Sequence, residues 1–327
     1  MKQLIINADD FGLSPGVNQG IVEAYQAGGI SNTTLMVNMP GFTDAVRLAS
    51  LHPEMGVGLH FNLTYGRPVS DVRLVPSLVQ KDGCFHSISE ISSRERSEIE
   101  IELLAQWDRF IATGLYPTHL DAHHHLHQVY PEVYEAMARL AARENIPMRR
   151  LQQPHHFSGN PDLIPIHVDQ VLLDTYDADN GLQKLLCYLH NLPPGSTEIM
   201  CHPGYVDEPL QTLSKLTKER ESELAVFCNP AVSKTIQNLG IHMIHYGLLE
   251  SAINEPIPKS SVAVSDTDYA SPVVPVQSLR PRRSVSQRKS FGKRKLKFHS
   301  LQRRKGRKRA LPRKKTRIAM RKKEKNR

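Results

Sequence analysis

The chain has 327 residues and an apolar content of 39%, enough for a sizeable core in one large α/β domain or two small ones. Its net charge of +9 is unevenly spread. Residues 280–327 hold 24 Lys and Arg against one acidic residue, a net charge of +23, whereas residues 1–279 hold 18 basic and 32 acidic residues, a net charge of −14. This distribution excludes a basic nucleic-acid-binding fold as a description of the whole chain. The four cysteines are widely separated, and no apolar run approaches the roughly 20 residues that span a membrane, so we expect a soluble cytoplasmic protein without a disulfide framework.

The first 250 residues alternate strand-like and helix-like segments. Short apolar runs predict strands at 4–8, 34–37, 56–59, 118–120, 148–149, 197–201 and 242–245. Helical spacing predicts helices that begin at Pro15 and cover 42–51, 91–113, 131–143, 181–192 and 213–227. Within the helix at 91–113, an apolar stripe of Ile101, Leu104, Trp107 and Ile111 is expected to face the core. The alternation favours an α/β fold with a parallel sheet and outer helices, closed or nearly closed into a barrel, although the strand count does not separate a barrel from an open sheet.

The C-terminal part of the chain has a different composition. From about residue 252 the alternation gives way to Pro, Ser and Val, and from residue 280 to runs of Lys and Arg. Such a segment has too little apolar surface to offset the entropy of ordering, so we expect a folded domain over 1–250, a linker over 251–279 and a disordered basic tail over 280–327. The tail is expected either to bind nucleic acid or another anionic surface, non-specifically and with a steep salt dependence, or to be a translation of the wrong reading frame.

Polar side chains collect where four of the predicted strands end. Asp9 and Asp10 follow the first strand, His60 follows the third, residues 121–127 follow the fourth, and His202 follows the strand at 197–201. The carboxyl ends of parallel strands lie at one edge of the sheet, so these groups are expected to meet. One carboxylate and two imidazoles with open positions for water make a catalytic type of metal site. A second carboxylate would then serve as a base and a further histidine as an acid.

Each of these residues also has a simpler interpretation. Asp9 and Asp10 precede Gly12 and could be turn residues, His60 could be a hydrogen-bonded histidine near the surface, and His202, which precedes Pro-Gly, could be a turn residue. Five histidines within residues 119–127 are harder to explain without function. The same ligand types would also suit an iron(II) oxygenase, but such sites are usually met on jelly-roll folds, which the alternating pattern does not favour.

Several of these motifs together resemble the YdjC-like carbohydrate deacetylases, the family of chitooligosaccharide deacetylase. The matching segments are residues 7–13 (NADDFGL), 58–64 (GLHFNLT), 118–127 (THLDAHHHLH) and, more loosely, 201–204 (CHPG). The resemblance spans about residues 1–250 and implies a barrel-like fold akin to the NodB-type polysaccharide deacetylases. It also implies a divalent metal, Mg²⁺ or alternatively Zn²⁺, and hydrolysis of the acetamide of N-acetylated amino sugars or oligosaccharides.

The resemblance also implies roles for individual residues. Asp10, His60 and His123 match the metal ligands, Asp9 the general base, and His202 a histidine that stabilises or protonates the leaving group. His124 and His127 are expected to lie beside the ligands, with Asp121 orienting one of these two histidines, and Arg149 and Asn62 are expected to support the site or bind substrate. A homodimer is plausible from the resemblance. Residues 251–327 have no counterpart in the family, so the tail is not expected to alter the core chemistry.

Overall fold

The structure is a computed structural model that describes residues 1–90, 94–152 and 165–249. The predicted linker at 251–279 and basic tail at 280–327 therefore lie outside the described residues. None of the helices in the described ranges has the length and apolarity needed to cross a membrane.

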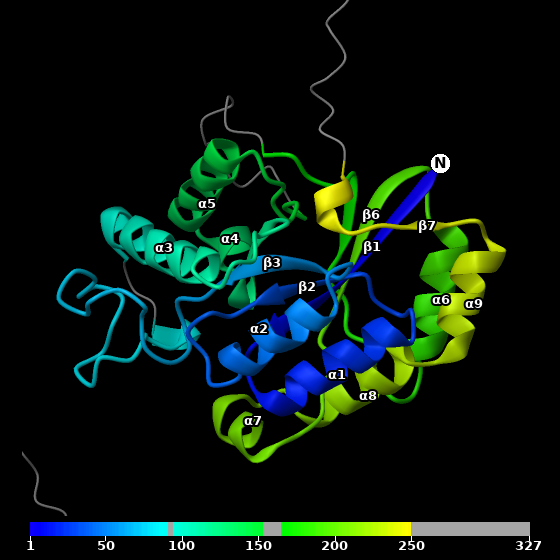
Figure 1. Ribbon diagram of the computed structural model, residues 1–327, viewed down its shortest axis with the longest axis horizontal. Coiled ribbons are helices and arrows are strands. Elements are labelled where there is room, and N and C mark those ends of the chain that lie inside the picture. Colours follow the sequence, from blue (N-terminus) through cyan, green and yellow to red (C-terminus); the bar gives the residue numbers. More distant parts are fainter. Residues whose placement is uncertain (91–93, 153–164, 250–327) are drawn as a thin grey trace, which may run out of the picture. The chain divides into compact units, whose positions relative to one another are not determined.

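A parallel sheet forms the centre of the fold (Figure 1). In the described residues it contains seven strands in the order β4-β3-β2-β1-β6-β5, and β7 pairs with β1. Every strand pair in this sheet is parallel. The strands are β1 (Lys2–Phe11), β2 (Asn32–Leu35), β3 (Gly56–Phe61), β4 (Leu120–Ala122), β5 (Gln170–Leu172), β6 (Gly195–Cys201) and β7 (His242–Met243).

The two edges of this sheet approach each other. Met148 forms a parallel bridge with Leu120, which places it beside β4 at one edge. The backbone N–H of Met148 donates to the carbonyl of Ile166, a few residues before β5 at the other edge, with an N···O distance of 2.8 Å. The sheet therefore curls into a nearly closed barrel, and the barrel-like α/β fold predicted from the alternation is confirmed.

Helices cover the outside of the barrel. They are α1 (Pro15–Gln26), α2 (Phe42–Leu51), α3 (Arg96–Ile111), α4 (Leu126–Val129), α5 (Pro131–Glu144), α6 (Gly181–Asn191), α7 (Glu208–Leu213), α8 (Lys218–Phe227) and α9 (Pro230–Asn238), with short 3₁₀ turns η1 (Ile88–Glu90), η2 (His123–His125) and η4 (Tyr246–Leu248). Helix α3 packs on α5, α1 packs on α2 and α8, and α6 packs on α8 and α9 (Figure 1). As predicted, α1 begins after Ser14, whose hydroxyl accepts from the N–H of Val17 and caps the helix.

Local predictions differ from the structure in a few places. Residues 9–11 were expected to form a turn but belong to β1, and β5, α7 and α9 were not predicted at all. In the predicted inward stripe of α3, Trp107 is buried as expected, but Ile101 and Leu104 are 37% and 38% exposed. The other buried apolar residues of the helix are Ile99, Leu103 and Phe110. The acidic and apolar residues of α3 alternate closely enough that spacing alone does not choose between the two stripes.

The barrel interior is polar at one end and apolar at the other. In β1, Leu4, Ile6 and Ala8 face the outer helices, while Ile5 packs inside the barrel against Val168 and Tyr246. Two residues further along the strand, alternation brings Asn7 and then Asp9 to the interior face. The functional side chains therefore lie inside the barrel towards the carboxyl ends of its strands.

Candidate active site

A bulge at the end of β1 brings two consecutive acidic side chains into the same region. In a regular strand Asp9 and Asp10 would face opposite sides of the sheet. The pairing of β1 with β2 shifts register between Ala8 and Phe11, and Asp10 has a left-handed backbone with φ of 73°. Such a bulge redirects a side chain, and a non-glycine residue in this conformation is strained, as is common at functional sites.

The bulge places Asp10 between two histidines. One oxygen of Asp10, Oδ1, lies 3.1 Å from Nε2 of His60 and 2.9 Å from Nδ1 of His123. The three side chains are buried, and they are a group whose ligand atoms are close enough to hold a metal ion. The sequence analysis named these residues as the metal ligands, and the structure brings all of them together.

Asp121 orients one of these histidines. His60 and Asp121 are register partners on neighbouring strands, so their side chains lie on the same face of the sheet. Nδ1 of His60 lies 2.5 Å from Oδ1 of Asp121 and 3.1 Å from the hydroxyl of Thr34. These contacts leave Nε2 directed at Asp10, an arrangement that fixes the ring and raises the basicity of a metal-binding histidine. Burial alone would lower the pKa of His60, but Asp121 and Asp10 outweigh it and raise the pKa to about 10.

Asp9 is held by a buried arginine. Nη1 and Nη2 of Arg149 donate to the two oxygens of Asp9 at 2.7 and 2.6 Å, and the side-chain amide of Asn7 donates to Oδ1 at 2.8 Å. Burial opposes ionisation of Asp9, but Arg149 outweighs it and holds the pKa well below its usual value. Arg149, which the sequence only loosely indicated, is thus the main partner of the proposed base.

The charge of this cluster suits a bound divalent cation. The cluster contains four buried carboxylates, those of Asp9, Asp10, Asp121 and Glu198. Two buried guanidinium groups oppose them: Arg149 contacts Asp9, Asp121 and Glu198, and Arg220 contacts Oδ2 of Asp10 at 2.5 Å. With His60 neutral, as a metal-binding imidazole must be, the cluster has an excess of two negative charges, which is costly in a dry interior unless a cation balances it.

The donor atoms fit such a cation as well. Nε2 of His123 is buried and has no hydrogen-bond partner in the described residues. Carboxylate oxygen and imidazole nitrogen are usual ligands of Zn²⁺, and ligand atoms at about 2.1 Å from an ion lie about 3.0 Å apart in octahedral and about 3.4 Å apart in tetrahedral coordination. The observed separations of 2.9 and 3.1 Å agree with the octahedral spacing.

The histidines after His123 are placed by an unusual turn. His124 and His125 both have left-handed backbones, with φ of 54° and 51°, in the 3₁₀ turn η2. Nδ1 of His124 lies 3.0 Å from the hydroxyl of Thr64, and its ring faces a surface pocket. Burial and the charge of Arg149 lower the pKa of His125 to about 3.

His127 does not contact the ligand cluster. It belongs to α4 and is fully buried, and its Nε2 lies 3.0 Å from the side-chain amide of Gln128. Asp121 was expected to orient His124 or His127, but this is wrong, because Asp121 contacts His60.

His202 follows β6 and faces the acidic pair. Its backbone N–H donates to Glu223 of α8, and its Nδ1 is buried with no hydrogen-bond partner in the described residues. Burial lowers the pKa of His202 to about 4, which the charges of Asp10 and Asp9 only partly oppose. At neutral pH its ring is neutral, with one N–H to donate.

Asn62 has a structural role in the loop after β3. Its side-chain oxygen accepts from the N–H groups of Thr64 and Tyr65, and its amide donates to the carbonyl of Tyr65 and to Asn38. The expectation that Asn62 binds substrate directly is not supported, because these partners occupy its polar atoms. The loop that it holds positions Tyr65, whose ring centroid lies 4.9 Å from that of His123.

A pocket opens beside the ligand cluster. It has a volume of about 730 Å³ and is lined by Tyr65, His124, residues 87–89 and residues 211–216. This lining includes serine, threonine, glutamine and lysine side chains, which hydrogen-bond to hydroxyl-rich ligands, beside the apolar Tyr65, Ile88, Leu213 and Leu216.

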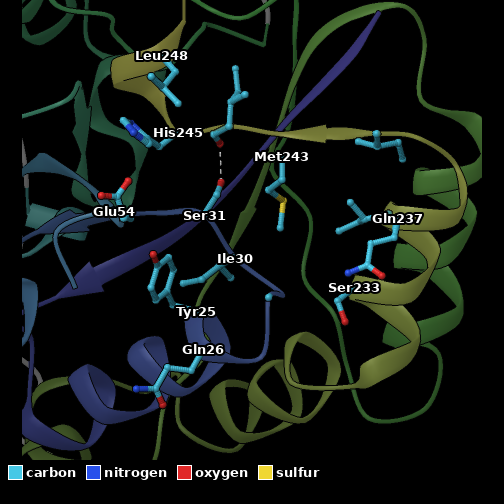
Figure 2. A pocket seen from close by; sticks show the side chains of 14 residues that line it. Tyr25, Gln26, Ile30, Ser31, Glu54, Ser233, Gln237, Met243, His245 and Leu248 are labelled. Carbon is cyan, nitrogen blue, oxygen red and sulfur yellow. Dashed lines mark hydrogen bonds between the residues drawn. The ribbon is translucent and has the colours of Figure 1, made fainter. Parts of the chain in front are cut away.

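A second cavity lies at the opposite end of the barrel (Figure 2). It has a volume of about 630 Å³, and its lining includes Ser31 and Glu54, which precede β2 and β3, and Met243 of β7. The ligand cluster lies at the other ends of these parallel strands, so this cavity is separate from the candidate active site.

Three residues of the site were not indicated by the sequence analysis. Arg220 of α8 contacts Asp10, Glu198 of β6 contacts Arg149, and Tyr246 of η4 donates to Glu198. Arg220 and Tyr246 carry no local motif. Glu198 is the single charged residue of β6, and that was the one signal available in the sequence.

Known proteins share both the sequence and the fold of this chain. A sequence model of the YdjC-like protein family matches residues 3–238. A carbohydrate deacetylase of Geobacillus stearothermophilus is 42% identical over 247 residues, which cover 75% of this chain and 97% of that protein. A chitooligosaccharide deacetylase of Yersinia enterocolitica is 33% identical over 250 residues, covering 75% and 98%. The crystal structure of a proposed cellobiose-phosphate cleavage protein from Enterococcus faecalis superimposes with a TM-score of 0.69 at 30% identity, covering 75% of this chain and 97% of the other.

The curled parallel sheet and its buried acid and histidine cluster define a hydrolase of the deacetylase type. The extent of these matches shows that the chain belongs to the YdjC-like family. The family expected from the motifs is therefore confirmed, and with it the enzyme class, a deacetylase that hydrolyses an amide bond.

Proposed function

We propose that this protein removes acetyl groups from N-acetylated amino sugars or their oligosaccharides and depends on a divalent cation held by Asp10, His60 and His123. The observation that carries the proposal is the contact of one Asp10 oxygen with both imidazoles at 3.1 and 2.9 Å, directly beside an ionised Asp9. The names of the relatives and the hydroxyl-binding groups of the adjacent pocket support a sugar substrate.

Bound there, Mg²⁺ or alternatively Zn²⁺ would polarise the acetamide carbonyl and make a water more acidic. Asp9 is ionised at neutral pH and accepts a proton from the attacking water, while Arg149 keeps its carboxylate in place. The water oxygen bonds to the carbonyl carbon, and the bond from that carbon to nitrogen then breaks. His202, whose ring is neutral, accepts the proton that Asp9 took and delivers it to the leaving amine, so that the products are acetate and an amino sugar.

An acetate-release assay tests this proposal. The purified chain is stripped of metal with a chelator, reloaded with Mg²⁺ or Zn²⁺, and incubated with N-acetylglucosamine and with diacetylchitobiose. We expect acetate release that chelation abolishes and one of the two metals restores. Absence of release by the loaded protein over a panel of acetylated sugars would reject the activity, and release that chelator leaves unchanged would reject the metal.

The basic tail supports a second proposal, that residues 280–327 bind nucleic acid or another anionic surface. Their net charge of +23 is the supporting observation, and such binding should be non-specific and weaken steeply with salt. Fluorescence anisotropy with labelled DNA and RNA compares the full chain with a chain that ends at residue 255. Loss of binding together with retained acetate release would separate the two functions, and a full chain that never binds at low salt would reject the idea.

The quaternary structure and cellular location stay predictions. We expect a cytoplasmic homodimer, and light scattering after size exclusion would contradict the dimer if the mass corresponded to a single chain of 36.9 kDa.

A further inference from the structure

Arg149 is held on every side by carboxylates. Its Nε lies 2.9 Å from Oε1 of Glu198, and its Nη2 lies 2.8 Å from the same oxygen. Its remaining contacts reach Asp9 through both Nη atoms and Asp121 through Nη1 at 2.8 Å. These five contacts match the five N–H donors of a guanidinium group, so the plane of Arg149 is fixed.

Of the three carboxylates, Glu198 has no direct part in the chemistry. Asp9 is the proposed base, and Asp121 orients His60, but Glu198 lies on the far side of Arg149. The free oxygen of Glu198, Oε2, accepts from the hydroxyl of Tyr246 at 2.5 Å. Glu198 therefore connects Arg149 to Tyr246.

Tyr246 closes the apolar end of the barrel. It is fully buried in η4, packs with Ile5 and Val168, and stacks on His119 with ring centroids 3.9 Å apart and planes 11° apart. The segment that carries it is anchored beside the second cavity, where the hydroxyl of Ser31 donates to the carbonyl of Ile244 at 2.7 Å (Figure 2). The position of the tyrosine hydroxyl is thus determined by the packing of the last described segment of the chain.

A second chain of hydrogen bonds runs from the same residue to the base. The backbone N–H of Tyr246 lies 3.3 Å from Oδ1 of Asn32, whose amide donates to Asn7 at 2.5 Å. The amide of Asn7 in turn donates to Asp9 at 2.8 Å. Asn7 and Asn32 are register partners on β1 and β2, which explains their contact. Two chains of contacts from Tyr246 therefore converge on Asp9.

We propose that Tyr246 and Glu198 are positioning residues for the deacetylation reaction, which hold Arg149 and through it the carboxylate of Asp9. This inference rests on the proposed function for its kinetic consequences. Neither residue touches the substrate or the metal ligands, so they should affect turnover and leave substrate and metal binding largely unchanged.

The test replaces Tyr246 by Phe, which removes the hydroxyl and keeps the stacking on His119. Mutation of a residue that hydrogen-bonds to a functional side chain typically lowers activity by about 10–100-fold. We therefore expect kcat on diacetylchitobiose to fall about tenfold in this variant. We expect KM and the Zn²⁺ dissociation constant to stay within about twofold. The control is Tyr176→Phe, because Tyr176 is also fully buried but its hydroxyl has no hydrogen-bond partner in the described residues. A Tyr246→Phe protein with the kcat of the control would overturn the inference.

A double-mutant cycle tests whether the two residues act through one chain of contacts. Glu198→Gln should lower kcat, and adding Tyr246→Phe to it should lower kcat by less than about twofold more. Independent, multiplicative losses would contradict a shared path. Glu198→Gln alone also tests the inference if the tyrosine variant does not fold.

An NMR measurement gives a readout that does not depend on activity. In protein with ¹⁵N-labelled arginine, the Nε–H of Arg149 should exchange slowly with solvent, and in Tyr246→Phe it should exchange at least about tenfold faster. Unchanged exchange would overturn the positioning role. If the wild-type protein releases no acetate while this exchange difference is present, the proposed activity fails and the structural linkage stands.

Discussion

The contact between Asp121 and His60 gives the sharpest prediction about the metal site. Asp121→Asn keeps the size of the side chain but removes its charge. The amide oxygen can still accept from Nδ1 of His60, but the amide nitrogen then faces Nη1 of Arg149, which lies 2.8 Å from Oδ2 in the native site. Two donors would oppose each other in a buried site, and the ring of His60 would lose its fixed orientation.

The expected loss is 10–100-fold in metal affinity, equivalent to about 1.4–2.8 kcal/mol. Isothermal titration of chelator-treated protein with Zn²⁺ measures it directly. Glu198→Gln is the matched control, because Glu198 is equally buried and also contacts Arg149, but it does not contact His60. A dissociation constant of Asp121→Asn within about threefold of wild type, or an equal weakening in Glu198→Gln, would refute this reasoning.

Three further predictions concern the base, the bulge and the buried histidines. Asp9→Asn should retain Zn²⁺ affinity by titration but lose about 10²–10⁴-fold in kcat in the acetate assay, and full activity would remove Asp9 from the role of base. Gly12→Ala should destabilise the fold by about 1–3 kcal/mol in urea denaturation, because its backbone has φ of 90° and a Cβ would lie 2.8 Å from the carbonyl oxygen of Met36. Gly114→Ala is its control, with φ of 84° and nothing within 4 Å, and an equal loss in both variants would show that the contact is unimportant. Burial holds the pKa of His127 well below its ordinary value of 6.5, so below pH 6.5 the unfolded chain binds a proton that the folded chain does not, and stability falls as the pH drops. His127→Gln should therefore flatten the decline in unfolding free energy between pH 6.5 and about 5, by up to about 1.4 kcal/mol per pH unit, and an unchanged slope in urea titrations would contradict it.

The sequence predicted the fold class and the location of the site, because both follow from short-range patterns along the chain. The alternation of apolar runs and helical segments predicted a barrel-like α/β fold, because parallel strands buried on both faces must be apolar and their crossovers must be helices. It also indicated that the residues after each strand would meet in a metal site, and the resemblance to the family then implied Asp10, His60 and His123 as its ligands. The short β5 at 170–172 was missed because three residues carry too little periodicity to be recognised.

Other features of the site depend on backbone geometry that no spacing reveals. Alternation along β1 would have sent Asp10 to the outer face, and only the bulge turns it inward. The pairing of His60 with Asp121 follows from the register of β3 and β4, and Asn62 is occupied by its own loop.

By itself, the sequence determined which kinds of side chain reach the carboxyl ends of the strands, because strand and helix periodicity act over a few residues. The tertiary structure alone decided the partners of those side chains. Arg220 comes from α8 to contact Asp10, and Tyr246 comes from η4 to support Arg149. These partners lie far apart along the chain. Closing the barrel buries several carboxylates close together, and a buried carboxylate is stable only when a cation or a hydrogen-bond donor contacts it. The segments that supply these contacts are therefore set by the packing of the whole domain.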